Sequence, residues 1–389
     1  MTDKPKISIA YLSVNDPLDK RSWSGTTYYI GQTLARNAGK VDFLGPVKIP
    51  WLLQKILNAF AKITRLLTGR RYETKYSLLL SWYTSRILKR RMQEKKYDCI
   101  VAPAASSELS FFKTHFPVIY ISDTTFHLIS KYYMEDFRDL SRLSEWEGNK
   151  VEKRALEKAG AVIFSSQWAA HSATSDYNIS ALKIHVLPLG ANMDEFPPRE
   201  IIHLKNSTPV LTLLFLAVYW ERKGGAIAFG AFKKIRATGV NAKFIVCGCI
   251  PPPEYADPDM EVIPFLNKNK QEDHDRFIQL LSTCHFLVLP TRADCSLLVA
   301  CEANAYGMPA ITTRTGGVPD IVVDGENGYC LPPEAGGEQY GDLINEIFQD
   351  KERYNQLVLS SRNRFEKRLN WDKWAEDFIR IFEAMEKPV

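Results

Sequence analysis

Residues 294–320 read DCSLLVACEANAYGMPAITTRTGGVPD and come shortly after the apolar run Phe286–Leu289. The apolar run predicts a buried β-strand, and the segment Leu298–Tyr306 predicts the helix that follows it. A further strand is predicted at Ala310–Thr313. A strand, a helix and a second strand in this order are typical of a parallel sheet with helices packed on its faces.

The same alternation of strand-like and helix-like segments extends over the whole chain. Its 389 residues exceed the usual size of a single hydrophobic core, so two domains are expected. We therefore predict an α/β protein with two Rossmann-like, doubly wound parallel-sheet domains. The further runs predicted as strands are Ile7–Ser13, Asp98–Ala102, Val118–Ser122, Ala161–Ser165, Ile184–Leu187, Leu211–Val218 and Lys243–Cys247.

The boundary between the domains is expected near residue 195, because the segment Pro188–Pro198 is rich in turn-forming residues. Residues 1–194 would form an N-terminal Rossmann-like domain, and residues 195–370 a C-terminal one. The last predicted helix lies in residues 371–389, after the second series of strands. It can pack back on the N-terminal domain.

Cysteine usage and the N-terminal sequence bear on the cellular compartment. The seven cysteines are scattered, with no spacing typical of a disulfide framework or a zinc site. Met1–Lys6 is polar, and no apolar run reaches about 18 residues, so neither a signal peptide nor a transmembrane helix is predicted. A reducing cytoplasm is the expected location. The absence of a P-loop and of a Gly-x-Ser-x-Gly motif leaves NTPase and hydrolase functions without support.

The start of the helix predicted at Leu298 is a candidate anion site. The loop Pro290–Cys295 leads from a strand into this helix, whose first N–H groups and positive dipole end attract a diphosphate. Asp294 and Glu302 are eight residues apart, which corresponds to no more than about 12 Å along a helix. That separation suits a nucleotide sugar, with one acid at the hexose hydroxyls and the other at the ribose. The alternative is an acid that complements the helix dipole, together with a surface glutamate.

A second candidate is the turn Trp220–Gly225 (WERKGG), which follows the strand Leu211–Val218. Adjacent Arg222 and Lys223 beside two glycines suit a diphosphate, because arginine offers a planar fork and lysine a point charge. The alternative is an ordinary basic turn exposed to solvent.

Together these motifs resemble the signature of the family-four retaining glycosyltransferases, which have the GT-B fold of two Rossmann-like domains facing a cleft. That signature has an acid, seven residues, and then a glutamate followed by alanine, which Asp294 and Glu302-Ala303 match. Asp294 departs from the family, which usually has glutamate there. The other matching elements are Gly307-Met308-Pro309, Gly316–Asp320, Asn327-Gly328 and Arg222-Lys223-Gly224.

The resemblance implies a role for the residues of the C-terminal domain. Lys223 and Arg222 would hold the donor diphosphate and neutralise the leaving group, so that no metal ion or cofactor is required. The expected catalytic residues are Lys223, Arg222, Asp294 and Asp123. The expected donor-binding residues are Gly25, Thr26, Arg222, Lys223, Asp294, Cys295, Ser296, Leu297, Leu298 and Glu302.

The resemblance also implies roles for two loops of the N-terminal domain. Gly25 and Thr26 follow the first strand, in a loop that would reach the donor phosphates and the acceptor. Asp123 follows the strand Val118–Ser122, at the place of a family histidine that contacts the donor sugar. His127 comes four residues later and is an alternative contact to the sugar or the acceptor.

The function expected from the resemblance is transfer of a sugar from a nucleoside diphosphate sugar to an acceptor hydroxyl, with retention of anomeric configuration. The acceptor would be a glycan or a lipid-linked glycan at the membrane face. Two alternatives stay open. One is a non-catalytic nucleotide-sugar or membrane-docked binding subunit on the same fold, and the other is a different enzyme such as an epimerase or a phosphorylase.

The net charge of +5 is concentrated in residues 48–75, which hold seven Lys or Arg and one Glu, so that the rest of the chain sums to −1. Between Pro50 and Gly69, apolar residues recur at helical spacing and polar or basic residues fill the other face. Such a helix can lie on an anionic membrane surface, or pack on the domain with a solvated basic face. Nucleic acid is not an expected partner, because the cations are not interleaved with aromatic residues. We expect a peripheral protein at the inner face of the plasma membrane, with contacts from Trp51, Lys55, Lys62, Arg65, Arg70 and Arg71.

Overall fold

The computed structural model describes residues 7–13, 15–92, 95–133, 137–200, 202 and 210–386. The chain forms two compact units. Unit 1 comprises Met1–Leu187 and Trp374–Val389, and unit 2 comprises Pro188–Lys373. The chain thus passes into unit 2 at Pro188, seven residues before the boundary expected at 195. It returns to unit 1 three residues into the last helix, α15 (Trp371–Glu386).

Unit 1 is built on a six-stranded parallel sheet with the strand order β2-β1-β3-β4-β5-β6. The strands are β1 (Ile7–Tyr11), β2 (Gly39–Phe43), β3 (Cys99–Pro103), β4 (Val118–Ser122), β5 (Ala161–Phe164) and β6 (Ile184–Val186). Every residue of β3, β4 and β5 is buried, as expected of parallel strands covered on both faces.

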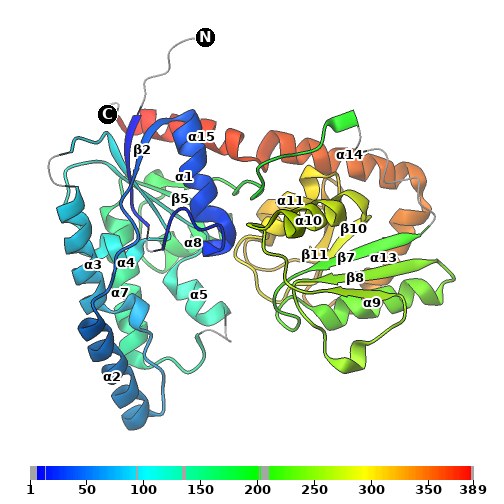
Figure 1. The fold of residues 1–389 in the computed structure, drawn as a ribbon, viewed down its shortest axis with the longest axis horizontal. Coiled ribbons are helices and arrows are strands. Elements are labelled where there is room, and N and C mark those ends of the chain that lie inside the picture. The colour runs from blue at the N-terminus through cyan, green and yellow to red at the C-terminus, as the bar shows by residue number, and fades with distance from the viewer. Residues whose placement is uncertain are drawn as a thin grey trace. The chain divides into compact units, whose positions relative to one another are not determined.

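The helices of unit 1 lie between successive strands in the sequence, with two of the described helices between β2 and β3 and two between β4 and β5 (Figure 1). They are α1 (Thr26–Asn37), α2 (Trp51–Thr68), α3 (Leu78–Arg91), α4 (Ser106–Ser110), α5 (Phe126–Tyr132), α7 (Arg142–Lys158) and α8 (Gln167–Ser175). Within this unit, the Met385 side chain of α15 lies against Gly160, just before β5. The predicted last helix therefore contacts the sheet of unit 1.

Unit 2 repeats the plan with a second six-stranded parallel sheet, in the order β12-β11-β10-β7-β8-β9. The strands are β7 (Leu211–Leu216), β8 (Ala242–Cys247), β9 (Met260–Ile263), β10 (Phe286–Leu289), β11 (Ala310–Thr313) and β12 (Gly328–Leu331). The helices are α9 (Gly225–Ala237), α10 (Gln271–Thr283), α11 (Leu298–Ala305), α12 (Val318–Ile321), α13 (Gly337–Gln349) and α14 (Lys351–Arg368). Two parallel sheets with helices between their strands confirm the predicted α/β, Rossmann-like class.

Among the described residues, the structure contains no helix with both the length and the apolar character needed to cross a membrane.

Two carboxyl groups are buried inside unit 1, on the helices α4 and α7. Glu108 and Glu152 are almost fully inaccessible to solvent. Burial raises the pKa of each of them to about 7. The hydroxyl of Tyr120 donates a hydrogen bond to Oε1 of Glu152 at 3.1 Å. In the described part of the chain, Oε2 of Glu108 has no hydrogen-bond partner.

The folded chain is therefore expected to lose stability as pH rises through about 7. Both carboxyls have an ordinary pKa of 4.5 when unfolded, so each binds its proton more tightly in the folded state. Their stabilising contribution is complete below pH 4.5 and is lost as pH rises through the raised pKa. The difference corresponds to on the order of 3 kcal/mol per carboxyl. Urea unfolding at several pH values from 4.5 to 8 measures how the free energy of unfolding changes with pH. Glu108→Gln should weaken this pH dependence.

Candidate functional site

The turns that follow β7, β10 and β11 meet at one edge of the unit 2 sheet, because these three strands are neighbours and parallel. Lys223 lies in the turn between β7 and α9, and Asp294 in the turn between β10 and α11. Gly317 follows β11, and its N–H donates to the backbone oxygen of Asp294 at 3.2 Å. The carboxyl edge of an open parallel sheet is where such folds bind ligands.

Lys223 and Asp294 form an ion pair at this edge. Nζ of Lys223 donates to Oδ2 of Asp294. The carboxylate is only 4% exposed and the lysine side chain is largely buried, so water competes little for their hydrogen bond. The structure thus brings two of the predicted site residues together. It gives Asp294 a partner on a neighbouring turn, which the sequence analysis had not foreseen.

Arg222 connects the same two turns through hydrogen bonds. Its guanidinium donates to the backbone oxygen of Ala293 at 3.0 Å, and its own backbone oxygen accepts from the N–H of Arg292 at 2.7 Å. The guanidinium also lies 5.0 Å from the ring centre of Tyr219. Arg222 is therefore positioned beside Lys223, with part of its hydrogen-bonding capacity committed to the β10 turn.

The turn after β7 requires glycine at position 224, because of its backbone conformation and its close approach to another turn. Its φ is +76°, in the left-handed region, and a Cβ placed there would lie 2.0 Å from the backbone oxygen of Pro290. Any side chain would push the β7 turn away from the β10 turn. The close approach of the two backbones holds Lys223 within reach of Asp294.

Glu302 forms the second ion pair of the site. It is 5% exposed on α11, and Nζ of Lys268 donates to its Oε1 at 2.6 Å. Burial raises the pKa of Glu302 above 4.5, and the nearby ammonium of Lys268 opposes this effect. Lys268 lies in the segment between β9 and α10, 4.1 Å above the ring of Phe277. Lys268 could not be predicted from the sequence, because no local motif links it to a glutamate 34 residues away.

The segment between Asp294 and α11 is tightly packed. Cys295 and Leu297 are buried, and Ser296 is nearly so. The N–H of Leu298 donates to the backbone oxygen of Ser296 at 2.8 Å, which makes a tight turn at the helix start. The N-cap residue of α11 is Leu297, whose apolar side chain makes no capping hydrogen bond. A helix start beside the ammonium of Lys223 is suited to an anion.

In unit 1 the loop before α1 meets the end of β4. Trp23 and Ser24 have φ of 48° and 55°, and Gly25, the N-cap of α1, has φ of 90°. Two consecutive non-glycine residues in the left-handed region indicate local strain of the kind found at functional sites. Nε1 of Trp23 donates to Oδ2 of Asp123 at 3.0 Å. The structure therefore joins the predicted Gly25 loop to the predicted Asp123.

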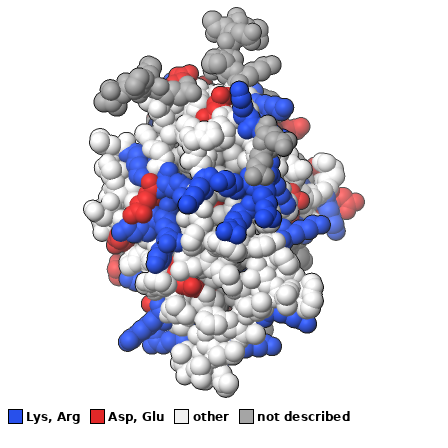
Figure 2. Space-filling view, turned by 90° about the vertical axis from the view of Figure 1, so that its left-hand side faces the viewer, with Lys and Arg blue, Asp and Glu red and all other residues white. Residues whose placement is uncertain are grey.

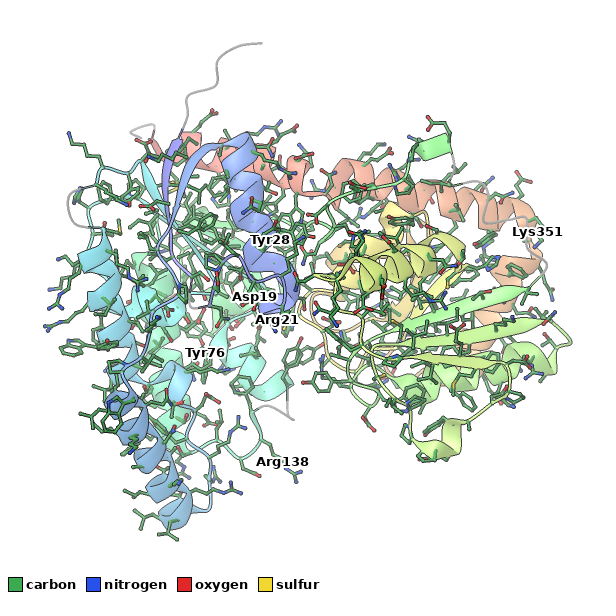
Figure 3. The ribbon with its side chains drawn as sticks, viewed as in Figure 1. Asp19, Arg21, Tyr28, Tyr76, Arg138 and Lys351 are labelled. Atoms are coloured by element: carbon green, nitrogen blue, oxygen red, sulfur yellow. The ribbon has the colours of Figure 1, made fainter. Side chains whose placement is uncertain are left out.

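Trp23 is a site residue that the sequence did not reveal, because its partner is 100 residues away in the chain. Thr26 is fully buried at the start of α1. Just upstream, the side chains of Asp19 and Arg21 pair with each other at 2.9 Å, and both are labelled in Figure 3 close to the start of α1.

His127 lies on α5, and its side chain contacts Lys131 of the same helix and Asp176 at the end of α8. Nζ of Lys131 donates to Nε2 of His127 at 3.0 Å, and Oδ1 of Asp176 lies 3.9 Å from the same nitrogen. Asp176 ends α8. His127 therefore contacts the end of α8, whereas Asp123 contacts Trp23 in the loop before α1.

The amphipathic helix forms as predicted, between Pro50 and Gly69, as α2. Only Leu57 and Thr64 of its 18 residues are buried, so the helix does not pack its wide apolar face on unit 1. Lys55 lies 4.6 Å above the ring of Trp51. Large side chains exposed on this helix are Trp51, Leu52, Ile56, Phe60, Ile63, Leu66 and Leu67.

Two of the basic residues after α2 are held by the protein itself. Arg70 donates from its guanidinium to the backbone oxygen of Leu140 at 3.5 Å. Arg71 pairs with Glu73 at 3.4 Å, and its N–H donates to the backbone oxygen of Asp139. Lys62 and Arg65 are exposed on α2 itself.

Two Rossmann-like units, with ion-paired cations and acids gathered at the carboxyl edge of the second sheet, define an α/β protein of the GT-B class. Residues 26–195 match the family model described as Glycosyltransferase Family 4, and residues 199–364 match the one described as Glycosyl transferases group 1. The two matches cover most of the chain. It belongs to the group 1 glycosyltransferase family.

Individual relatives are distant. Spore coat protein SA of Bacillus subtilis is 32% identical over 123 residues, which are 29% of this chain and 33% of that protein. MMP alpha-(1->4)-mannosyltransferase of Mycolicibacterium hassiacum is 21% identical over 245 residues, 60% of this chain and 56% of that protein. The chain thus matches less than two thirds of the length of either relative.

The solved structure of Anabaena HepE in complex with UDP and glucose has a similar fold. It aligns with a TM-score of 0.64 at 14% identity, over 97% of this chain and 100% of that one. At 14% identity, this likeness shows a shared fold and nothing more specific.

Proposed function

We propose that this protein transfers a sugar from a nucleoside diphosphate sugar to an acceptor hydroxyl. The observation that carries the proposal is the buried Lys223–Asp294 pair beside the start of α11. An ammonium group has three N–H donors, and Asp294 accepts only one of them. Within the part of the chain that the structure describes, the other two donors have no recorded acceptor and are available to phosphoryl oxygens, while Asp294 fixes the position of the ammonium.

Lys223 and Arg222 have a chemical role in the proposal because negative charge develops on the departing diphosphate. When the bond between the sugar C1 and the diphosphate breaks, the departing diphosphate gains negative charge. A positioned ammonium and a neighbouring guanidinium stabilise that charge more in the transition state than in the ground state. Lys223 and Arg222 supply these groups in the proposal, so no metal ion is needed for this step.

Glu302 is proposed to bind hydroxyl groups of the donor. Its carboxylate can accept several hydrogen bonds, and Lys268 occupies one oxygen. Asp123, oriented by the indole of Trp23, is proposed to do the same for a sugar or acceptor hydroxyl. The similarly folded HepE has been solved in complex with UDP and glucose, which supports a nucleotide-sugar donor for this chain.

We further propose that the anomeric configuration is retained, as the family-four resemblance implies. Proton NMR of the first-formed product distinguishes retention from inversion, and transfer in excess EDTA tests the independence from metal ions. An inverted product, or activity abolished by EDTA and restored by a divalent metal, would contradict these parts of the proposal.

A panel of UDP-, GDP- and ADP-sugars tests the function itself. The correct donor should raise the apparent melting temperature by mass action, and nucleoside diphosphate should be released in the presence of an acceptor. Family membership favours an enzyme over a non-catalytic binding subunit. Stabilisation by a nucleotide sugar without transfer to any acceptor would instead favour the binding subunit.

The acceptor is proposed to be lipid-linked and to be met at an anionic membrane surface. The support is α2, whose apolar face is exposed and whose other face carries lysine and arginine. An exposed contiguous apolar surface of this kind is typical of an interaction site, and the cations complement anionic headgroups. The peripheral cytoplasmic location expected from the sequence fits this surface.

Replacing Leu66 and Leu67 by serine is expected to weaken binding to phosphatidylglycerol vesicles by about tenfold or more, because two aliphatic side chains no longer enter the interface. These residues are 86% and 77% exposed, so the fold should be unaffected. Vesicle co-sedimentation measures the change. Leu182→Ser, at a leucine that is 94% exposed outside α2, is the matched control. Equal loss in both variants, or none in either, would contradict the assignment.

A further inference from the structure

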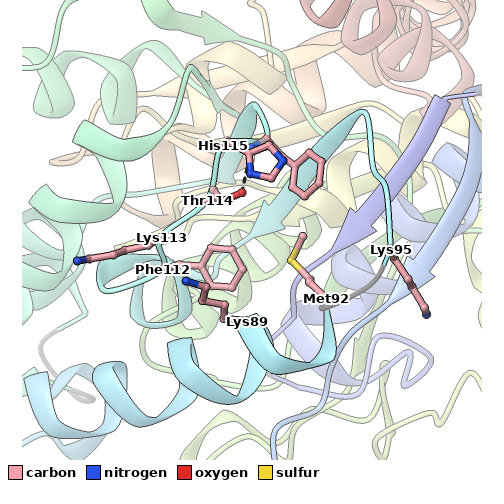
Figure 4. Close-up of a pocket in the computed structure, with 8 residues that line it drawn as sticks. Lys89, Met92, Lys95, Phe112, Lys113, Thr114 and His115 are labelled. Carbon is pink, nitrogen blue, oxygen red and sulfur yellow. Dashed lines mark hydrogen bonds between the residues drawn. The ribbon is translucent and has the colours of Figure 1, made fainter.

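A pocket of about 510 Å³ opens in unit 1 at the C-terminal end of α3 (Figure 4). One wall is the last turn of α3 with Lys89 and Met92, and the other is the segment with Phe112, Lys113 and His115. Met92 and Phe112 are buried and form an apolar floor. The volume lies in the range of small-molecule sites.

This pocket is remote from the Asp123 end of the sheet. The lining segment from Phe112 leads into the amino end of β4, whereas Asp123 follows its carboxyl end. The five residues of β4 separate the two edges by about 16 Å. The pocket is therefore a feature separate from the edge that carries the proposed sugar chemistry.

Positive charge gathers on this side of unit 1. Figure 2 shows Lys and Arg side chains concentrated across the middle of the face on which α3 lies. In Figure 4 the amines of Lys89 and Lys113 reach to the same side of the pocket. Among the described residues no ion pair is recorded for either, whereas Lys95 on the rim pairs with Asp42 at 2.7 Å.

The end of α7 adds two more cations next to Lys113. Burial lowers the pKa of Lys158, and the positive charges of Arg154 and Lys113 lower it further. The guanidinium of Arg154 lies 4.5 Å from the ring centre of Phe111. Its Nη1 is buried and, in the described part of the chain, has no hydrogen-bond acceptor. Three neighbouring cations, one of them with a buried donor that lacks an acceptor among the described residues, raise the positive potential on this side of the pocket and favour an anion there.

We propose that this pocket binds a phosphate-bearing ligand. The phosphoryl oxygens would lie between the ammonium groups of Lys89 and Lys113, and an apolar part of the ligand would contact Met92 and Phe112. Arg154 and Lys158 add positive charge beside Lys113. Flexible ammonium groups with three donors each suit the several oxygens and the double charge of a phosphate. A free phosphate compound and a lipid headgroup present this same chemistry.

Lysine acetylation of the full chain, read out by peptide mass spectrometry, tests the site residue by residue. The probes are inorganic pyrophosphate and phosphatidylglycerol vesicles, with phosphatidylcholine vesicles as the blank. At a probe concentration about ten times Kd, acetylation of Lys89, Lys113 and Lys158 should slow by about tenfold. Exposed Lys243, on β8 of unit 2, should react at an unchanged rate.

The two probes distinguish the source of the phosphate. Protection by pyrophosphate assigns a soluble phosphate compound, and protection by phosphatidylglycerol vesicles alone assigns a lipid headgroup. Unchanged reactivity of the three lysines with both probes overturns the proposal.

Variants separate this pocket from the rest of the surface and from the donor site. Lys113→Gln should abolish protection of Lys89 and Lys158, whereas Lys153→Gln, at an exposed lysine of α7, should retain it. Protection should also persist in Lys223→Ala, because that residue lies in unit 2. Protection that survives Lys113→Gln, or that disappears in Lys223→Ala, contradicts the assignment.

Discussion

Replacing Lys223 by alanine is expected to lower kcat/KM for sugar transfer by about 100- to 1,000-fold. The ammonium of Lys223 is fixed by Asp294 in a largely buried position, so it needs little reorganisation when the diphosphate departs. Removing one such positioned donor from an enzyme typically costs this much in rate. Steady-state kinetics with the donor found in the nucleotide-sugar panel measures the effect.

The matched control is Lys233→Ala. Lys233 is half-exposed on α9, ten residues further along the chain, and pairs with Asp257 at 2.9 Å. Arg236 also pairs with Asp257, at 3.0 Å, so the carboxylate keeps a cationic partner in this variant and transfer should be almost unchanged. Because Lys223→Ala removes the ammonium that pairs with the buried carboxylate of Asp294, urea unfolding of the variant must show that the protein remains folded under assay conditions. A folded variant with wild-type kcat/KM would contradict the role of Lys223.

Asp294 should act through Lys223. Asp294→Asn keeps the shape of the side chain but removes the charge that holds the ammonium. If the two residues form one unit, the double variant should be little worse than Lys223→Ala alone, because coupled residues are not additive. Independent, additive losses would indicate that Asp294 contacts the sugar directly, as the sequence alone suggested.

Replacing Glu302 by glutamine is expected to lower kcat/KM by about 10- to 100-fold. A hydrogen bond to a charged acceptor contributes about 1.5–3 kcal/mol, and glutamine keeps the shape while removing the charge. If Glu302 binds donor hydroxyls in the ground state as well as in the transition state, most of the loss should appear in KM.

The pH profile gives this prediction a sharper test. Burial raises the pKa of Glu302 and Lys268 opposes the rise, so its charged form is lost as pH falls through a value above 4.5. Lys268→Met removes the opposing charge, which should raise the pKa further and move the acid limb of kcat/KM to higher pH. The limb should be absent in Glu302→Gln. Identical profiles in all three proteins would exclude a role for the Glu302 charge.

The fold was predictable from the sequence where strands lie inside the sheets. Central parallel strands such as β3, β5 and β10 are buried over their whole length, so they appear as uninterrupted apolar runs. The three strands that the sequence analysis missed, β2, β9 and β12, all lie at sheet edges. No residue of β2 is buried, β9 has one buried residue at its end, and β12 alternates buried with half-exposed positions, so none of the three gives an uninterrupted buried run.

The site was predictable where it depends on local motifs. Arg222, Lys223 and Asp294 stand in turns whose position follows directly from the alternation of strands and helices. Their partners were harder to foresee. Lys268 and Trp23 reach Glu302 and Asp123 from distant parts of the chain, and no spacing rule connects such residues before the sheets are assembled.

The central claim is that the carboxyl edge of the unit 2 sheet binds the donor diphosphate through Lys223. A crystal structure of the full chain with the nucleoside diphosphate that most raises its melting temperature tests this most directly. We expect phosphoryl oxygens at hydrogen-bond distance, within about 3.2 Å, of Lys223 Nζ, with the nucleoside extending toward Glu302. A diphosphate bound elsewhere, with Lys223 and Glu302 sharing no ligand, would contradict it.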